Sequence, residues 1–123
     1  MGRVTPVIDT NILIDLLNGI PEAKTELARY TDATISSLTW AEVMVGCRDG
    51  EEQRVRDFLS SYQVRPFDLE IADIAWRLRK RYRMRLPDAA IWDTAKHAGS
   101  RLVTRNSRDF PESEKDIHIP YRI

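Results

Sequence analysis

The sequence has few of the residues that bind soft or borderline metal ions. It contains one cysteine, Cys47, and two histidines, His97 and His118, in 123 residues. A single cysteine excludes an intrachain disulfide, and its apolar neighbours predict a place in the core rather than a reactive thiol. Neither histidine has a cysteine or a second histidine at the short spacings typical of zinc sites. Any metal ion is therefore expected to be bound through oxygen, and His97, four residues after Asp93, is expected to form a surface ion pair.

Long apolar runs are also missing. No segment approaches the roughly 18 consecutive apolar residues that a membrane span needs, and the amino end lacks the pattern of a signal peptide. We therefore expect no membrane association and a cytoplasmic location. With 42% hydrophobic and 31% charged residues, the composition is that of an ordinary globular protein. A length of 123 residues predicts one domain, covering residues 1–123.

The chain has no net charge, yet its charges are divided unequally. Residues 1–60 hold 10 acidic and 6 basic side chains, a net −4, and residues 61–123 hold 9 acidic and 13 basic, a net +4. The excess is concentrated in residues 77–85, where six of nine residues are Arg or Lys. Arginine suits phosphate because its planar guanidinium can donate two parallel hydrogen bonds. This basic run predicts either a contact with a polyanion or a solvated helix face.

Apolar residues recur at strand and helix spacings in alternation along the chain. Strands are predicted at 4–8, 33–36, 63–67 and 101–104, and helices at 10–17, 21–30, 40–47, 51–60, 71–83 and 87–98. Gly99 is expected to end the last helix in a left-handed conformation, and residues 117–121, which include a proline, are expected to form an edge strand or a clamp across the surface. The alternation indicates an α/β fold, a three-layer sandwich with a mainly parallel central sheet and helices on both faces.

Four acidic residues lie where predicted strands or turns give way to helices or loops: Asp9, Glu42, Asp88 and Asp109. In parallel sheets, functional sites form at the carboxyl ends of the strands, so the four carboxylates are expected to face one crevice there. Each also has a purely structural explanation. Asp9 could cap a helix, Glu42 could complete a capping box with Thr39, Asp88 could interact with a helix dipole, and Asp109 could belong to a polar turn. Together, however, four converging carboxylates would repel one another unless a cation such as Mg²⁺ bound between them.

Four short segments carry a resemblance to a known family. They are Ile-Asp-Thr-Asn-Ile-Leu at 8–13, Ser-Ser-Leu-Thr-Trp-Ala-Glu-Val at 36–43 followed by Gly46, Leu-Pro-Asp-Ala-Ala-Ile at 86–91, and Thr-Arg-Asn with Asp-Phe within 104–110. In this order and spacing, over nearly the whole chain, they resemble a PIN-domain ribonuclease, particularly the VapC-type toxins of bacterial and archaeal toxin–antitoxin pairs. The resemblance implies a PIN-like fold.

The resemblance also implies the site residues. The catalytic and metal-binding carboxylates would be Asp9, Glu42, Asp88 and Asp109, and nearby polar groups that support them or contact substrate would be Asn11, Thr104 and Asn106. Asn106 stands where some family members have another acid, which leaves open whether it or Asp109 faces the metal. Asp93, after Trp92, replaces a small apolar residue and has no assigned purpose. Arg83 and Arg85 are expected to contact the substrate backbone or an acidic partner.

The implied activity is that of an endoribonuclease, the toxin of a toxin–antitoxin pair, in which one or two Mg²⁺ or Mn²⁺ ions activate water for attack on RNA. Such attack leaves 5′-phosphate and 3′-hydroxyl ends. A cognate antitoxin is the implied protein partner, and a homodimer is expected. The RNA sequence that is cut does not follow from the chain.

Two functions from other classes remain open. One is a phosphoacceptor signalling domain. Such domains have a pair of acids after the first strand and a lysine after the last, whereas here Asp9 lacks an adjacent acid and Arg105 stands where the lysine is expected. The other is a metal-free module that binds RNA or a partner and in which the acids only cap helices.

Overall fold

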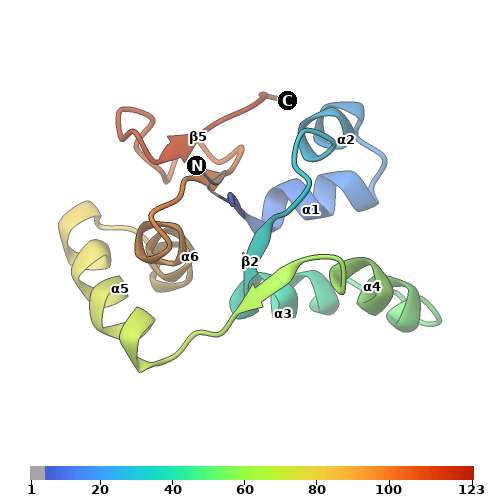
Figure 1. Cartoon of the computed structure of the whole chain (residues 1–123), viewed down its shortest axis with the longest axis horizontal. Helices are drawn as coiled ribbons and strands as arrows, with labels where there is room; N and C mark the ends of the chain where they lie inside the picture. Colours follow the sequence, from blue (N-terminus) through green and yellow to red (C-terminus); the bar gives the residue numbers. More distant parts are fainter. Residues whose placement is uncertain (1–4) are drawn as a thin grey trace.

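Five short strands form the centre of the fold (Figure 1). The computed structural model describes residues 5–123, so Val4, the predicted start of the first strand, lies outside the described part. The strands are β1 (Val7–Ile8), β2 (Thr34–Ser36), β3 (Gln63–Arg65), β4 (Leu102–Val103) and β5 (Ile117–His118). Their order in the sheet is β3-β2-β1-β4-β5, and every neighbouring pair is parallel. The predicted parallel sheet is confirmed, with β5 at one edge.

The described residues form six helices. These are α1 (Thr10–Leu17), α2 (Pro21–Leu27), α3 (Ser37–Val45), α4 (Glu52–Leu59), α5 (Leu69–Tyr82) and α6 (Leu86–His97). None of them is long and apolar enough to cross a membrane. Helix α2 ends at Leu27 rather than near residue 30, and α5 begins two residues before its predicted start because Asp68 accepts a hydrogen bond from the Ile71 amide (3.0 Å) and caps it.

The start of α3 differs from the prediction in a way that affects the site. Ser36, not a residue next to Trp40, caps the helix, because its hydroxyl accepts a hydrogen bond from the Leu38 amide (3.1 Å). The helix therefore begins at Ser37, and Glu42 lies in its second turn. The capping box between Thr39 and Glu42 and the first-turn position of Glu42 are both wrong. Glu42 is left without the structural explanation that the sequence offered for it.

Two apolar clusters, one on each face of the sheet, make the three layers. Alternate strand residues point to opposite faces. Val7, Leu102 and Ile117 pack with α5 and α6, whereas Ile8, Ile35 and Val103 pack with α1, α3 and α4. Figure 1 shows the same division, with α5 and α6 on one side of the strands and α1, α3 and α4 on the other. The predicted three-layer sandwich is confirmed.

Helix α6 is buried along most of its length between the sheet and α5. Trp92 is fully buried and its ring lies 4.9 Å from Tyr82 and 6.2 Å from Phe110, measured between ring centroids. The helix ends as predicted, because Gly99 adopts φ +64° just beyond it. Its first turn is held at the carboxyl edge of the sheet, which places Asp88 there.

Candidate functional site

Two polar residues directly follow two neighbouring strands, the central strand β1 and the adjacent β4. Asp9 comes after β1 and Thr104 after β4, and these strands are neighbours. The Thr104 hydroxyl donates a hydrogen bond to Asp9 Oδ2 at 2.8 Å, across 95 residues of sequence. The parallel pairing thus brings together two residues that are far apart in the sequence, and Asp9, which is 4% exposed, is buried at this point.

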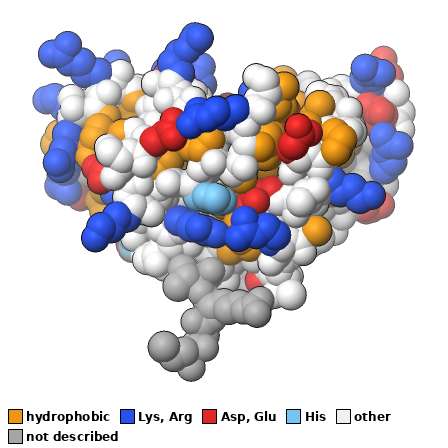
Figure 2. All heavy atoms as spheres, turned by 90° about the horizontal axis from the view of Figure 1, so that it is seen from above, with side chains coloured by type: hydrophobic (Ala, Val, Ile, Leu, Met, Phe, Trp, Pro, Cys, Tyr) orange, Lys and Arg blue, Asp and Glu red, His pale blue; other side chains and the backbone are white. Residues whose placement is uncertain are grey.

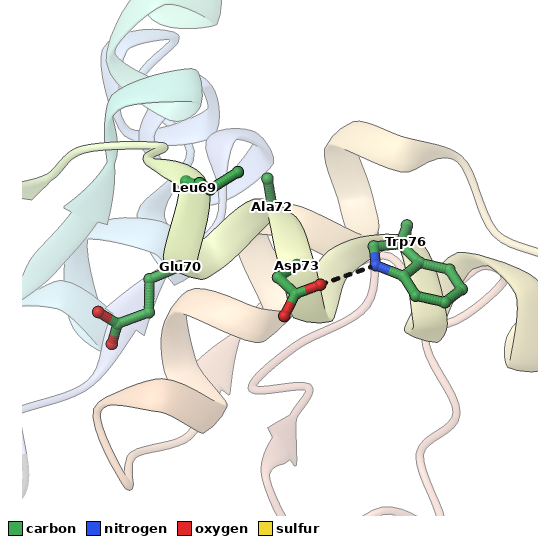
Figure 3. Close-up of a pocket in the computed structure, with 5 residues that line it drawn as sticks. All are labelled: Leu69, Glu70, Ala72, Asp73 and Trp76. Atoms are coloured by element: carbon green, nitrogen blue, oxygen red, sulfur yellow. Dashed lines mark hydrogen bonds between the residues drawn. The ribbon is translucent and has the colours of Figure 1, made fainter.

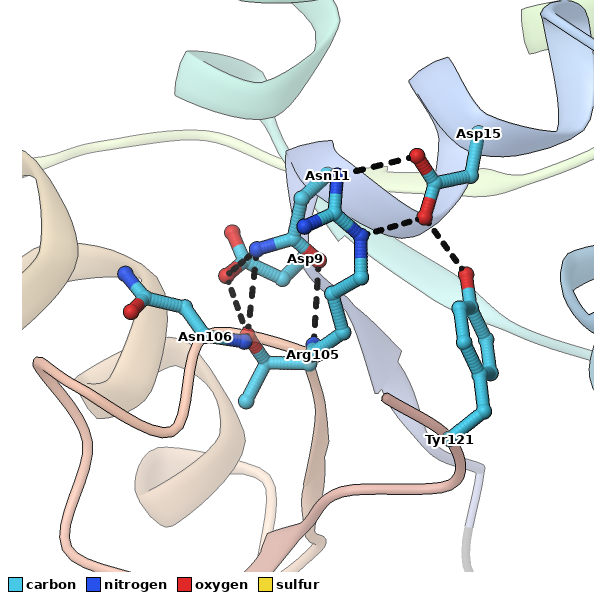
Figure 4. Close-up of polar contacts among 7 residues, drawn as sticks. Asp9, Asn11, Asp15, Arg105, Asn106 and Tyr121 are labelled. Carbon is cyan, nitrogen blue, oxygen red and sulfur yellow. Dashed lines mark hydrogen bonds and ion pairs between the residues drawn. The ribbon is translucent and has the colours of Figure 1, made fainter. Parts of the chain in front are cut away.

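The carboxylate of Asp9 is fixed from more than one side (Figure 4). Its Oδ1 accepts a hydrogen bond from the Thr10 amide at 2.7 Å, which caps α1. Its Oδ2 accepts a further bond from Asn11 Nδ2 at 3.1 Å, and Asn11 Nδ2 also lies 3.2 Å from Thr104 Oγ1. Asp9 is therefore both the helix cap and the centre of a polar cluster, so the two explanations offered by the sequence do not exclude one another.

Burial dominates the acidity of Asp9. It raises the pKa of this carboxyl from 3.8 to about 6, although the hydrogen bonds from Thr104 and Thr10 act in the opposite direction. The negative charges of Asp88 and Glu42 raise this pKa further. Three carboxylates from three different elements therefore lie within electrostatic reach of one another.

Glu42 reaches the cluster from α3. Its Oε1 accepts a hydrogen bond from the Thr10 hydroxyl at 2.6 Å, and Thr10 Oγ1 lies 3.1 Å from the hydroxyl of the buried Thr39. Thr10 thus connects Glu42 to the residue next to Asp9. The part played by the two threonines was missed from the sequence, although Thr10 follows Asp9 directly and Thr39 precedes Glu42 by one turn.

Asp88 lies in the first turn of α6, as predicted, and is 7% exposed. Burial raises its pKa, the positive charge of Arg85 and its hydrogen bond act against this, and the charges of Asp109 and Glu42 raise it again. Arg85 Nε lies 3.3 Å from Asp88 Oδ2. An exposed arginine therefore partly neutralises this carboxylate.

Asp109 is exposed and belongs to the polar turn that the sequence suggested. It exchanges hydrogen bonds with Asn106, whose Nδ2 donates to Asp109 Oδ2 (2.9 Å) and whose Oδ1 accepts from the Asp109 amide (3.2 Å). The backbone N–H of Asn106 donates to Thr104 Oγ1 at 3.0 Å. Since the acceptor oxygen of Asn106 is already engaged with Asp109, Asp109 offers the freer oxygen atoms, and its charge acts on Asp88.

The donor chemistry of these residues fits a hard divalent cation, because all of the groups are oxygen atoms of carboxylates, hydroxyls or amides. Within residues 5–123, however, no three acidic, histidine or cysteine side chains lie close enough together to hold one ion. Glu42 is turned to Thr10, Asp88 to Arg85 and Asp109 to Asn106. Shared binding of an ion requires these side chains to turn from their present partners toward Asp9.

The basic run is divided between the site and the solvent. Arg85 contacts Asp88, whereas Arg83 is exposed in a left-handed conformation (φ 55°) after the end of α5. On the exposed side of α5, Arg77 lies 3.6 Å from Asp73 and 5.1 Å from the Trp76 ring centroid, and Lys80 lies 5.9 Å from that centroid. The solvated-face interpretation therefore suits the helical part of the run, whereas Arg85 lies against an acid of the candidate site.

A shallow hollow on α5 lies apart from the four acids of the candidate site. It is lined by Leu69, Glu70, Ala72, Asp73 and Trp76 (Figure 3). Trp76 Nε1 donates to Asp73 Oδ1 at 3.2 Å, and Leu69 is 84% exposed. None of the acids predicted for the site lines this hollow, so the functional candidate stays at the edge of the sheet.

Several other sequence predictions are corrected or refined. His97 pairs with Glu70 at 2.6 Å rather than with Asp93, which is fully buried. Arg105 directs its guanidinium to Asp15, not to Asp9, so it does not take the place of a phosphoacceptor lysine. Cys47 is only half-buried, and it packs against the edge of the apolar cluster formed with α1, α3 and α4, so its predicted core position is partly correct. Asp15 and Tyr121, which lie beside the site in Figure 4, were missed from the sequence.

Comparison with known proteins gives consistent results. The PIN domain model matches residues 7–115. Ribonuclease VapC19 of Mycobacterium tuberculosis is 32% identical over 124 aligned positions, which cover 94% of this chain and 98% of that protein. Ribonuclease VapC10 of the same organism is 31% identical, covering 95% of this chain and 93% of that protein.

Solved structures agree with this assignment. A chain in a toxin–antitoxin complex from Klebsiella pneumoniae has a TM-score of 0.92 and 40% identity, covering 97% of this chain and all (100%) of that chain. FitAcB from Neisseria gonorrhoeae has a TM-score of 0.79 at 22% identity, covering 97% of this chain and 100% of that one, which supports the fold alone. With the parallel sheet, the family match and these relatives in agreement, the chain belongs to the PIN-domain family, among its VapC-type toxin ribonucleases.

Proposed function

We propose that this protein is a metal-dependent endoribonuclease that acts as the toxin of a toxin–antitoxin pair. The observation that carries the proposal is the gathering of acids from four parts of the chain at one edge of the sheet, where Asp88 and Glu42 raise the pKa of the buried Asp9. The names of the relatives support the activity, and the metal is inferred from the chemistry of the acids.

The four acids have different parts in this proposal. Asp9 and Asp88 are the most buried and are the principal ligands, while Glu42 and Asp109 complete the set from the more exposed side. A bound Mg²⁺ or Mn²⁺ ion would lower the pKa of a water molecule and offset negative charge at the phosphorus atom. One or two ions are compatible with four carboxylates.

The neighbouring polar groups orient the acids and the substrate. Thr104 and Asn11 donate to Asp9 Oδ2 and so fix the orientation of its carboxylate. Asn106 holds Asp109 in the same way. Arg85, and Arg83 two residues before it, would bind the phosphate backbone of RNA, since an arginine freed from Asp88 by a cation can donate to phosphate.

The decisive experiment is cleavage of end-labelled structured RNA by wild type and Asp88→Asn, each with Mg²⁺, with Mn²⁺ and with EDTA. We expect wild-type cleavage that EDTA abolishes and a loss of about 100-fold or more in Asp88→Asn, because a ligand to the metal is removed. The products should carry 5′-phosphate and 3′-hydroxyl ends. Cyclic 2′,3′-phosphate ends would refute water as the nucleophile.

Asp73→Asn provides a matched control. Asp73 is an exposed acid on α5, outside the site, so the same change of acid to amide should leave cleavage intact. Equal cutting by wild type and Asp88→Asn would reveal a contaminating nuclease. A calorimetric Mn²⁺ titration distinguishes the metalloenzyme from a metal-free binding module. The metalloenzyme should bind Mn²⁺ and lose this binding in both Asp9→Asn and Asp88→Asn, whereas the metal-free module should show no such binding.

Two partners belong to the same proposal. A cognate antitoxin is inferred because the solved relative from Klebsiella pneumoniae is a toxin–antitoxin complex. Its test is growth: expression of the wild type should arrest a host cell, Asp88→Asn should not, and the adjacent antitoxin gene should restore growth. A homodimer is inferred because Leu69 and Trp76 expose apolar surface on α5, and light scattering should give twice the 14.3 kDa chain mass.

A further inference from the structure

Asp15, Arg105 and Tyr121 form a network beside Asp9 (Figure 4). They come from α1, from the segment after β4 and from the segment after β5. Arg105 donates twice to Asp15, from Nε to Oδ2 at 2.5 Å and from Nη2 to Oδ1 at 3.0 Å. The Tyr121 hydroxyl donates to Asp15 Oδ2 at 2.8 Å, across 106 residues of sequence. The C-terminal segment is thereby joined to α1 close to the candidate site.

The network has little freedom to change its geometry. Asp15 is 4% exposed, so its carboxylate depends on these donors in place of water. A bidentate contact fixes the plane of the guanidinium as well as its distance. Burial, followed by the hydrogen bond to Asp15, raises the pKa of the Tyr121 hydroxyl, so this group remains the donor at neutral pH. Loss of the hydroxyl would leave a buried carboxylate oxygen short of one donor.

Arg105 carries the constraint to the site through its backbone. Its amide donates to Asn11 Oδ1 at 3.2 Å. Because that oxygen is engaged, the Asn11 amide nitrogen is directed to Asp9 Oδ2 (3.1 Å) and to Thr104 Oγ1 (3.2 Å). Asn11 and Asp15 lie one helical turn apart on α1, so Arg105 binds one with its backbone and the other with its side chain.

A simpler explanation is that these contacts only tie down the end of the chain. The chain offers a contact that does this alone. Arg122, next to Tyr121, places Nη2 2.7 Å from each carboxylate oxygen of Glu112, on an exposed part of the surface. This pair binds the same segment and has no hydrogen bond to Asp9, Asn11 or Thr104. The two explanations therefore predict different results for the two contacts.

We propose that Asp15, Arg105 and Tyr121 are positioning residues that hold Asn11 and Thr104 against Asp9, so that the C-terminal segment sets the geometry of the catalytic carboxylate. The inference rests on the function proposed above. It assigns to Tyr121 a contribution to catalysis although its hydroxyl bonds to Asp15 and to none of the four acids of the site.

The test compares Tyr121→Phe and Arg105→Lys with the control Arg122→Gln. Tyr121→Phe removes one hydroxyl, Arg105→Lys keeps the charge but cannot make the bidentate contact, and Arg122→Gln loosens the segment elsewhere. Three quantities are measured in each protein: kcat and KM for RNA cleavage, the dissociation constant for Mn²⁺ by calorimetry, and hydrogen exchange of the Arg105 amide without metal.

We expect kcat to fall and the Mn²⁺ dissociation constant to rise by about tenfold in Tyr121→Phe, as for groups that orient a metal ligand. The KM should stay the same because the Tyr121 hydroxyl is directed to Asp15, away from the four acids at which RNA would be cut. Exchange of the Arg105 amide should become faster. Arg105→Lys should change all three quantities in the same direction, and Arg122→Gln should match wild type.

Three results would overturn the inference. Unchanged kcat and Mn²⁺ affinity in Tyr121→Phe, with an active wild type, would refute the positioning network and leave the proposed function in place. An equal loss in Arg122→Gln would show that general attachment of the segment is what matters. A wild type that neither cleaves RNA nor binds Mn²⁺ would refute the proposed function and this inference with it.

Discussion

Asp93 is fully buried in α6, and both of its carboxylate oxygens lack a hydrogen-bond partner among the described residues. Burial raises its pKa from 3.8 to about 6, against the attraction of His97, Lys96 and Arg65. The folded state therefore holds the proton more tightly than the unfolded chain does. The stability contributed by this proton is present at about pH 4 and is lost as the pH rises through 6.

Asp93→Asn should accordingly stabilise the protein at neutral pH. The amide carries no charge to desolvate, so the free energy of unfolding at pH 7.5 should rise by about 2 kcal/mol, and the gain should vanish near pH 4. Urea unfolding of both proteins across this pH range measures the difference. Asp73→Asn, a change at an exposed acid, should show no such pH dependence. A gain that is the same at pH 4 and 7.5 would contradict an ionised, buried Asp93.

At the scale of secondary structure, the ends of the helices decide where the acids point. Pro87 and Gly99 mark the two ends of α6 in the sequence, and the structure confirms both, with Asp88 in the first turn. The start of α3 could not be predicted equally well, because residues 36, 37 and 39 are all Ser or Thr and each can cap a helix. Local pattern therefore located Asp9 and Asp88 correctly and misplaced Glu42 by one turn.

Gly99→Ala and Gly46→Ala form a matched pair of helix-end substitutions. A methyl group at Gly99 meets nothing within 4 Å, so its cost comes from φ +64° alone, and the free energy of unfolding should fall by about 1 kcal/mol. At Gly46 the backbone is helical and the new methyl lies 3.5 Å from the Val43 carbonyl oxygen, an ordinary contact. Gly46→Ala should be neutral or slightly stabilising in the same urea unfolding assay. Equal destabilisation by both would contradict the left-handed conformation at Gly99.

At the scale of the whole molecule, charge is distributed without a single dominant sign. Figure 2 shows Lys and Arg side chains interspersed with Asp and Glu on the face seen from above Figure 1, in keeping with a net charge of zero. Sequence composition gave the net balance and the basic run. It could not separate Arg85, which lies on Asp88, from Arg77 on α5, because that separation depends on how α5 and α6 are connected. The contacts of Asp15 with Arg105 and Tyr121 could not be predicted from local patterns either, because these residues lie 90 and 106 positions away in the sequence.

Arg85→Ala should weaken RNA binding chiefly at low salt. Loss of one phosphate contact should reduce the slope of log K against log salt by about 0.7 for single-stranded RNA, so the difference from wild type shrinks as salt is raised. Binding is measured with Ca²⁺, which binds carboxylates and so frees Arg85 from Asp88, and a gel confirms that the RNA stays intact. Arg77→Ala, in the same basic run but paired with Asp73, should keep the wild-type slope. Equal slopes for Arg85→Ala and wild type would show that Arg85 contacts Asp88 but no phosphate of the RNA.

The pairing of β1 with β4 also bears on the synthesis of the protein. Thr104, the partner of Asp9, is synthesised 95 residues after it, and Tyr121 is synthesised later still. Such distant contacts form slowly and only when both partners are available. A nascent chain that stops before β4 therefore contains three of the four acids without the strand that aligns them. Newly made copies therefore acquire the aligned site only after β4 has been synthesised and has paired with β1.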